Sequence, residues 1–235
     1  MKLPLYISVP HAGTDVPSEV RSLCALRRED ILADRDAGAE LIYFPLQKYV
    51  AGFTRTDIAR SLIDLNRAPD DIGGNGVIKS HTCWKVPVYR TFPPKKMIQT
   101  LLDRYYFPYH AKLSAGGNSS STRLGVDCHT MAAVGPPVGP DPGKKRPLVC
   151  LSNCHGTTCP EEWLHCMASC LQAAFGEPVT INNPFSGGFI SRLHAAEMPW
   201  VQIEISQTAA FPDNIKRDCL LEGLQSFCHT VFRNA

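Results

Sequence analysis

Histidine, carboxylate and guanidinium side chains stand at the ends of several apolar segments of this sequence. The segments LPLYISV, RSLIDL, RLGVDCHT and VQIEIS have the composition of β-strands, and the polar residues within or just after their ends are His11, Asn66, Arg67, His129 and Glu204. Imidazoles can hold a divalent ion, a carboxylate can activate water, and a guanidinium can bind an anionic substrate. The combination therefore predicts a metal-assisted hydrolase.

Taken singly, each of these residues also has a structural explanation. A histidine after a strand can be a hydrogen-bonded loop residue, Arg67 can belong to a surface ion pair of little energetic value, and Glu204 can face outward from an edge strand. Their occurrence together favours a shared site, because the carboxyl ends of strands in an open α/β sheet face the ligand crevice.

The elements that must position these residues alternate between strands and helices. We expect strands at 3–9, 60–65, 123–130, 147–153, 179–182 and 201–206, and helices at 38–51, 95–114, 160–175 and 213–232. Pro45 and Pro108 must shorten or kink two of these helices. The loops 67–94 and 135–147 are rich in glycine and proline, and a loop as long as the first is usually functional or mobile. The pattern predicts one domain over 1–235, a three-layer α/β/α sandwich with a mostly parallel sheet.

Composition excludes several classes of protein. The 235 residues are 44% hydrophobic and 20% charged with a formal net charge of +2, so we expect no nucleic-acid partner. No apolar run approaches the ~20 residues that a membrane-spanning helix needs, so we expect no membrane partner. The opening MKLPLYISVPHAG indicates a buried strand and not a signal peptide, which favours a cytoplasmic location.

Ten cysteines are many for such a chain, and five of them lie between 150 and 170. A structural zinc or iron–sulfur site is one interpretation. However, the chain has no C-x-x-C pair, and the spacings match no common ligand pattern. We therefore expect reduced cysteines that pack as small hydrophobic side chains.

Seven segments, in this order, carry a resemblance to a known family: SVPHAGTDVP, DRDAGAELIY, ARSLIDLNRAPDD, YHAKL, DCHTM, NNPFSGGFISRLH and VQIEISQ. Together they span positions 8 to 207 and resemble the N-formylglutamate amidohydrolase (deformylase) family. That family is similar in turn to the zinc carboxypeptidases and aspartoacylases. The resemblance implies a zinc-exopeptidase-like α/β sandwich, one Zn²⁺ ion per chain and a role in histidine catabolism.

The resemblance also implies the metal ligands. His11 in VPHAG would be the first and His129 in DCHTM the last. Carboxypeptidase-type relatives place a glutamate three residues after the first histidine, but Thr14 occupies that position here. Asp36 in DRDAGAE is the best substitute as the carboxylate ligand. The alternatives are Asp15, Asp34 and Asp127, the last of which could instead orient His129 from the same face of its strand.

Catalytic and substrate-binding roles follow from the same resemblance. Glu204 would be the general base and Arg60 would assist at the oxyanion, while Asn66 and Arg67 would bind the carboxylate of a small anionic N-acyl amino acid. The remaining expected substrate-binding residues are Tyr109, His110, Gly187 and Gly188. The tyrosine and histidine could equally be packed side chains, and the glycine pair could equally form a structural turn.

The implied reaction is removal of a formyl or similar acyl group from a substrate such as N-formyl-L-glutamate, which gives the amino acid and formate. A carboxypeptidase-like peptidase and another N-acyl amino acid hydrolase are the enzyme alternatives. The non-enzyme alternative is a cysteine-rich metal-binding or redox module.

Overall fold

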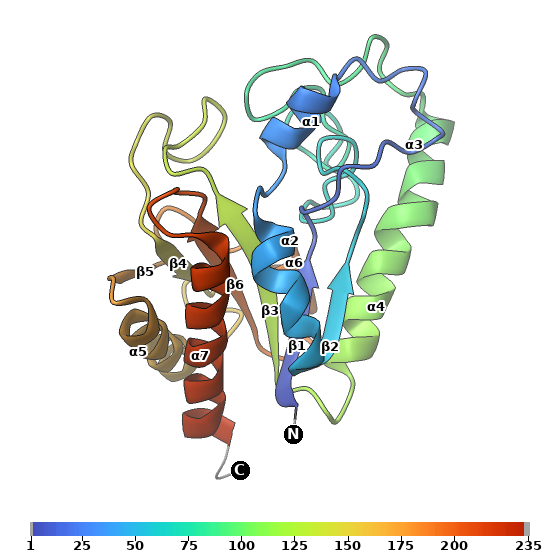
Figure 1. Ribbon diagram of the computed structural model, residues 1–235. Helices are drawn as coiled ribbons and strands as arrows, with labels where there is room; N and C mark the ends of the chain where they lie inside the picture. The colour runs from blue at the N-terminus through green and yellow to red at the C-terminus, as the bar shows by residue number, and fades with distance from the viewer. Residues whose placement is uncertain (1, 233–235) are drawn as a thin grey trace.

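A six-stranded mixed sheet forms the middle layer of the protein (Figure 1), whose computed structural model describes residues 2–232. The strands are β1 (Leu3–Val9), β2 (Val50–Arg55), β3 (Leu124–Met131), β4 (Val149–Ser152), β5 (Val179–Ile181) and β6 (Trp200–Ser206). Their order across the sheet is β2-β1-β3-β6-β4-β5. Neighbouring strands are parallel except β4 and β6, which are antiparallel.

Helices cover both faces of the sheet, as the sandwich prediction requires. They are α1 (Arg28–Asp34), α2 (Ala39–Tyr43), the 3₁₀ turn η1 (Phe44–Lys48), α3 (Lys95–Leu101), the π-helical turn η2 (Leu102–Tyr106), α4 (Phe107–Gly117), α5 (Glu161–Phe175), α6 (Phe189–His194) and α7 (Asp213–Phe232). One face packs against α2, α5 and α7 and the other against α4 and α6. Within residues 2–232, no helix combines the length and the apolar character needed to cross a membrane.

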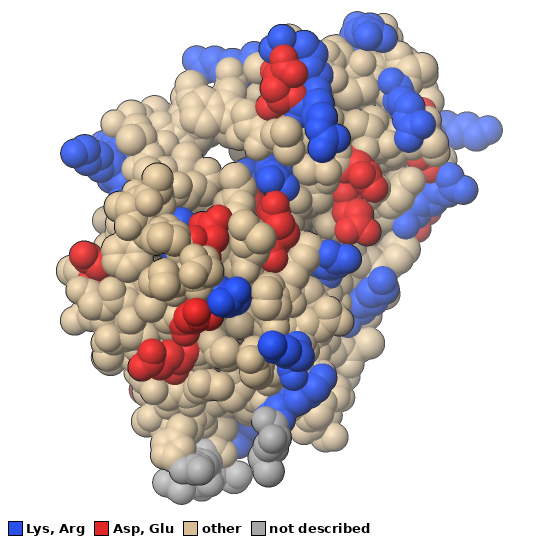
Figure 2. Space-filling view, in the orientation of Figure 1, with Lys and Arg blue, Asp and Glu red and all other residues tan. Residues whose placement is uncertain are grey.

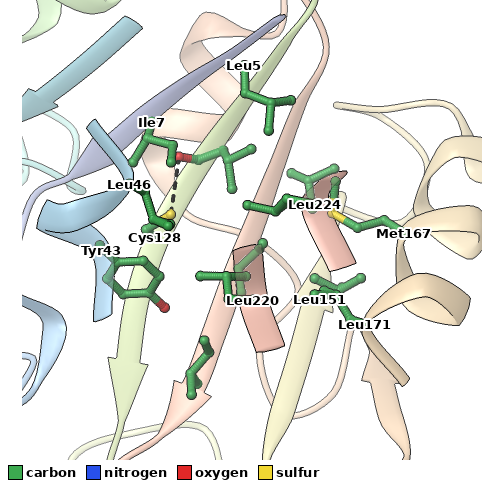
Figure 3. Packing of buried hydrophobic residues seen from close by; sticks show 14 of the residues in the cluster. Leu5, Ile7, Tyr43, Leu46, Cys128, Leu151, Met167, Leu171, Leu220 and Leu224 are labelled. Atoms are coloured by element: carbon green, nitrogen blue, oxygen red, sulfur yellow. Dashed lines mark hydrogen bonds between the residues drawn. The ribbon is translucent and has the colours of Figure 1, made fainter. Parts of the chain in front are cut away.

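Alternating side chains of the strands divide the hydrophobic core in two. Leu5 and Ile7 of β1 join the cluster under α2, α5 and α7, whereas Tyr6 between them joins the cluster on the opposite face. Figure 3 shows Leu220 of α7 and Leu171 of α5 near Leu151 of β4 in the first cluster. Successive residues of a strand point to opposite faces, so each strand contributes to both layers.

The second face is apolar at the amino ends of the strands and polar toward their carboxyl ends. The strand register pairs Ser8 with Asp127, Asp127 with Gln202, and His129 with Glu204. These five side chains are buried, although all are polar. Buried polar groups need hydrogen-bond partners or a ligand, so this end of the sheet is the place to look for a site.

Two of the elements predicted from the sequence are wrong. Residues 60–65 form buried turns and not a strand, and the missed second strand is β2, at residues 50–55. The predicted helix 38–51 is only α2 followed by η1, with Pro45 near the start of η1, and its last residues enter β2. The segment Val50–Arg55 pairs in parallel with β1. Hydrogen bonding to β1 therefore ends the helix that the apolar spacing of residues 38–51 had predicted.

The other predicted elements agree with the structure within a few residues. The helix predicted over 95–114 is α3 and α4 joined by η2. This turn lies just before Pro108, which has no N–H to donate to the helical hydrogen-bond pattern. The loop 135–147 contains no helix or strand. Two short helices, α1 and α6, were not predicted.

Charged side chains of both signs are interspersed on the face shown in Figure 2. The pattern agrees with the formal net charge of +2. The chain's distinctive electrostatics therefore lie in the buried polar groups at the carboxyl ends of β1, β3 and β6, and not on this surface.

Candidate metal and active site

A cavity of about 300 Å³ opens at the carboxyl ends of β1, β3 and β6. His11, Asp36, Arg60, Arg67, His129 and Glu204 all line it, together with Asn66, Gly187 and Gly188. The loop segments around Trp84 and between Ala132 and Arg146 contribute much of the remaining wall. The structure thus brings nine of the eleven predicted site residues to one cavity, although they come from distant parts of the chain.

His11, Asp36 and His129 converge in the floor of the cavity. Their potential ligand atoms all lie within 4.8 Å of one another, and all three residues are buried. Asp36 Oδ2 is 3.0 Å from His129 Nδ1 and 3.7 Å from His11 Nδ1. The Nδ1 atom of His11 is buried without a hydrogen-bond partner among the described residues. Two imidazole nitrogens and one carboxylate oxygen, with one of the nitrogens buried and unpartnered, form a set of ligands that fits a divalent metal ion.

A second carboxylate holds each histidine from behind. Asp64 Oδ1 lies 2.7 Å from His11 Nε2, and Asp127 Oδ2 lies 2.9 Å from His129 Nε2. A proton on each Nε2 satisfies these carboxylates, so each Nδ1 could offer its lone pair to a metal ion bound between the two rings and Asp36. Carboxylates behind metal-binding histidines fix the tautomer and the ring orientation in this way.

The alternative carboxylate ligands lie elsewhere. Asp127 is behind His129, where the sequence allowed it as an orienting residue. Asp34 lines the cavity but accepts a hydrogen bond from the Cys83 amide and faces Lys79. Asp15 forms an isolated backbone bridge with Ile58. Among residues 2–232, one cluster brings at least three potential metal ligands together, and it consists of His11, Asp36 and His129. Asp36 is thus its carboxylate, and no cysteine belongs to it.

Cationic side chains stabilise these buried carboxylates. Arg60 donates to Asp36 Oδ1 at 3.1 Å and to Asp64 Oδ2 at 3.3 Å, and the fully buried Lys79 lies 3.1 Å from Asp64 Oδ2. Burial alone would raise the pKa of Asp64, but His11 when it is protonated in acid, together with Lys79 and Arg60, holds this pKa well below its usual range. Arg60 therefore links the Asp36 carboxylate to the one behind His11.

The two histidines have opposite pKa shifts. Burial, aided by the charge of Arg60, lowers the pKa of His11 to about 4. Burial would also lower the pKa of His129, but Asp127, Asp36 and Glu204 outweigh it and raise this pKa well above the usual range. Without an ion, His11 is neutral at pH 7 and His129 is protonated.

Glu204 provides a carboxyl group with an unusual pKa on the strand beside His129. Burial, together with the negative charge of Asp36, raises the pKa of Glu204 to about 7, although His129 opposes this shift. Gln202 Nε2 donates to Glu204 Oε1 at 2.9 Å. A carboxyl group that titrates near neutral pH is suited to take up and return a proton. β6 lies between β3 and β4, so Glu204 does not stand on an edge strand.

The guanidinium of Arg67 is held by two backbone oxygens. Its Nε donates to the backbone oxygen of Asn75 at 2.8 Å and its Nη1 donates to that of Asn66 at 3.0 Å. No carboxylate partner is found for it in the described part of the chain. Its charge acts on the Asp64 carboxylate without a direct ion pair, and protons on Nη1 and Nη2 remain free for a ligand.

The other arginines of the cavity are already paired with carboxylates. Arg35 faces Glu40 at 3.0 Å, and Arg146 holds Asp141 with two nitrogens, at 2.6 Å from Nη2 and 2.9 Å from Nε. Arg60, described above, bridges two aspartates. Arg67 is thus the strongest candidate for a group that binds a substrate carboxylate.

Asn66 supports the site from within. Its Nδ2 lies 3.0 Å from Asp127 Oδ2 and 3.1 Å from His129 Nε2, and its Oδ1 accepts from the amide of Ile190 at 2.8 Å. A Cβ on Gly188 would collide with the Asn66 side chain, which accounts for the glycine. The side chain predicted to bind substrate with Arg67 is therefore already engaged in holding Asp127 and β3.

Gly187 is required by its backbone. Its φ of +125° is rarely adopted by residues with side chains, and a Cβ there would overlap Cys154 Sγ. The two glycines thus allow the backbone to approach the side chains of Asn66 and Cys154 closely, and both glycines also line the cavity.

Tyr109 and His110 do not line the cavity, contrary to the prediction from the sequence. The Tyr109 hydroxyl lies 2.9 Å from Ser8 Oγ, which donates to Asp127 Oδ1. His110 lies between His194 and the backbone oxygen of Leu65. Both side chains are buried in the layer between α4 and the sheet, because the inward face of α4 packs on β1 and α6.

Several residues of the cavity were not identified from the sequence. They are Arg35, Asn75, Trp84, Arg146, Gln202 and Gln207. Gln202 could have been found, since it is two residues before Glu204 and shares its face of β6. Asn75 and Trp84 lie on the loop 67–94, whose length indicated function without identifying residues. Arg146 ends the proline-rich loop 135–147, and no sequence pattern places that loop over the site.

Comparisons with known proteins identify similar chains. The family model described as N-formylglutamate amidohydrolase matches residues 3–210. An N-formylglutamate deformylase of Pseudomonas putida is 25% identical over 221 residues, which covers 88% of this chain and 81% of the relative.

Two crystal structures share the fold. That of an N-formylglutamate amidohydrolase from Ralstonia eutropha JMP134 has a TM-score of 0.77 at 22% identity and covers 100% of this chain and 96% of the other. That of a gene product from Agrobacterium tumefaciens has a TM-score of 0.74 at 16% identity and covers 98% of this chain and 91% of the other.

Proposed function

The chain belongs to the N-formylglutamate amidohydrolase family, hydrolases of linear amide bonds, and we propose that it removes the formyl group from N-formyl-L-glutamate or a closely related N-acyl amino acid. The products are the free amino acid and formate. The observation that carries the proposal is the buried His11, Asp36 and His129 cluster, with Glu204 on the adjacent strand and Arg67 in the same cavity.

One Zn²⁺ ion is the proposed cofactor. His11 Nδ1, a carboxylate oxygen of Asp36 and His129 Nδ1 would hold it, and the unpartnered His11 Nδ1 supports this assignment. Two histidines and one carboxylate form a set that catalytic zinc sites use. When bound, the ion would polarise the substrate carbonyl and increase the acidity of a water molecule.

Glu204 is the proposed proton carrier. Its carboxylate accepts the proton of the attacking water and then passes it to the departing amine nitrogen as the amide C–N bond breaks. Burial is the largest cause that raises the pKa of Glu204 above its usual range, and it favours a carboxylate that takes up a proton readily. Gln202 holds one oxygen of the carboxylate, which leaves the other available to the water.

Arg67 and Arg60 are proposed to bring positive charge to the substrate. Arg67 binds its carboxylate, because its guanidinium is pinned by two backbone oxygens and has no acidic partner among residues 2–232. Arg60 lines the cavity beside Asp36 and its side chain is 22% exposed, so its guanidinium charge can stabilise charge on the carbonyl oxygen.

An assay of formate release from N-formyl-L-glutamate, with and without a chelator, tests the proposal. We expect turnover that is lost with the chelator and restored by Zn²⁺, together with one equivalent of zinc by elemental analysis. His129→Ala should abolish both the zinc and the turnover. Turnover that survives complete removal of metal would overturn the metal-dependent reaction, and full zinc occupancy in His129→Ala would overturn the ligand set.

A further inference from the structure

A chain of buried hydrogen bonds runs behind the cavity from Leu65 to Glu197. His110 Nε2 lies 3.0 Å from the Leu65 oxygen, and His110 Nδ1 lies 2.9 Å from His194 Nε2. His194 Nδ1 in turn lies 2.9 Å from a carboxylate oxygen of Glu197. The two imidazole rings are stacked, with centroids 5.2 Å apart and an interplanar angle of 13°.

The acceptors at the two ends determine the number of ring protons. A backbone carbonyl can only accept, so His110 Nε2 carries a proton. The ionised, partly exposed carboxylate of Glu197 also accepts, so His194 Nδ1 carries a proton. The 2.9 Å contact between the rings needs one more proton. Three protons on two imidazoles amount to one positive charge, which Glu197 balances.

The surroundings of His110 disfavour a positive charge on that ring. Burial and the charge of His194 lower the pKa of His110 to about 4, so His110 is neutral at pH 7. The rings of Tyr106 and Phe189 pack around His110, and Trp200 packs on His194. Besides Glu197, the carboxylate whose charge acts on His110 is that of Asp127.

The end of the chain at Leu65 lies inside the segment that supplies the site. Leu65 separates Asp64, the partner of His11, from Asn66 and Arg67. The segment has no helix or strand to satisfy its backbone, and its bonds reach the Val77 oxygen, the Asp64 carboxylate and His110. A buried carbonyl without regular structure must be bonded by a side chain or by water, and His110 bonds the one at Leu65.

We propose that His110, His194 and Glu197 form a positioning relay, in which one imidazolium charge fixes the His110 Nε2–H donor on Leu65 and thereby holds the 64–67 segment in its binding geometry. The relay extends the proposed function, since Arg67 and Asp64 act in that reaction. None of its three side chains lines the cavity, so they are positioning residues.

Nitrogen chemical shifts of the histidines in the wild-type protein test the proton count directly. At pH 7 we expect neutral His110 with its proton on Nε2, and His194 with protons on both nitrogens. In Glu197→Gln we expect His194 to become neutral at the same pH. A proton on His110 Nδ1 alone, or a neutral His194 in the wild type, would overturn the relay. These shifts do not depend on activity, so the relay and the proposed reaction can fail separately.

Kinetics of substituted proteins test the positioning. His110→Phe removes the donor, and we expect the KM for N-formyl-L-glutamate to rise about tenfold with zinc content unchanged, as for loss of one buried hydrogen bond. His110→Gln can still donate an amide proton and should recover most of the loss. The matched control is Glu161→Gln, which breaks the exposed 3.5 Å pair with His165 and should change neither KM nor kcat. A folded His110→Phe protein with the wild-type KM would refute the relay.

Discussion

Replacement of Asp64 by asparagine should weaken metal binding and stability together, because one carboxylate binds three side chains. Its Oδ1 lies 2.7 Å from His11 Nε2, and its Oδ2 lies 3.3 Å from Arg60 and 3.1 Å from Lys79. Loss of a carboxylate behind a metal-binding histidine typically reduces metal affinity by ~10–100-fold. Breaking a buried ion pair costs ~3–5 kcal/mol. In Asp64→Asn, Lys79 would still have Asp34 at 3.7 Å as an acidic partner. We therefore expect the free energy of unfolding to fall by about 3 kcal/mol, the lower end of that range.

The pH dependence separates this effect from a packing defect. The pKa of Asp64 is well below its usual value in the folded protein, so its charge contributes stability above pH ~4 that is lost as the pH falls through the folded pKa. The difference in unfolding free energy between the wild type and Asp64→Asn should therefore be largest near pH 7 and shrink in acid.

Urea unfolding between pH 3 and pH 7 and competitive zinc titration measure the two effects. Asp141→Asn is the matched control, because it removes a carboxylate from the buried Arg146 without touching a histidine. It should lower stability and leave zinc affinity unchanged. Wild-type zinc affinity in Asp64→Asn, or a stability deficit that does not depend on pH, would refute the reasoning.

Four further outcomes are expected. Glu204→Gln should keep zinc and fold but lose about 10²–10⁴ in kcat, because the amide cannot carry the proton; wild-type turnover would leave Glu204 a structural role only. Arg67→Lys should be nearly as poor as Arg67→Ala on N-formyl-L-glutamate, while an α-ester should be a poor substrate that is indifferent to either change; equal losses on both substrates would exclude the carboxylate contact. Zinc binding at pH 7 should release protons, because His129 is protonated without the ion whereas His11, with a pKa of about 4, is already neutral; calorimetric heats independent of the buffer would contradict this. Leu220→Ala should cost ~2–5 kcal/mol of unfolding free energy with no change in KM, since Leu220 is fully buried in the core cluster under α7; a changed KM would couple that core to the site.

Local patterns sufficed for much of the fold and for several residues of the site. The apolar runs that became β1, β3, β4 and β6 were evident because a buried strand needs consecutive hydrophobic or alternating side chains. The helices α5 and α7 were evident from their spacing and from the residues at their starts. The histidines at the ends of two such strands indicated a common edge of the sheet, and His11 and His129 do meet there.

The partners of those histidines depended on the tertiary structure. Asn66 and Arg67 reach the cavity from buried turns. The sequence predicted their position correctly but from a strand at 60–65 that the structure does not contain. Asp64 follows no recognisable pattern, yet the fold brings it within 2.7 Å of His11 across 53 residues of sequence. Spacing along a chain carries no information on such contacts, because they depend on how separate segments pack.

The direction of α4 was likewise decided by packing. The sequence places Tyr109 and His110 on the helix predicted over 95–114, but a helix has several faces, and the one that carries these residues packs against the sheet and α6. The protonation of Glu204 also depends on the folded structure. The sequence contains Glu204 as an ordinary glutamate, and only its burial beside Asp36 raises its pKa to about 7. Residue types and strand ends are encoded locally, whereas protonation and hydrogen-bond partners arise from desolvation and proximity, which exist only in the folded chain.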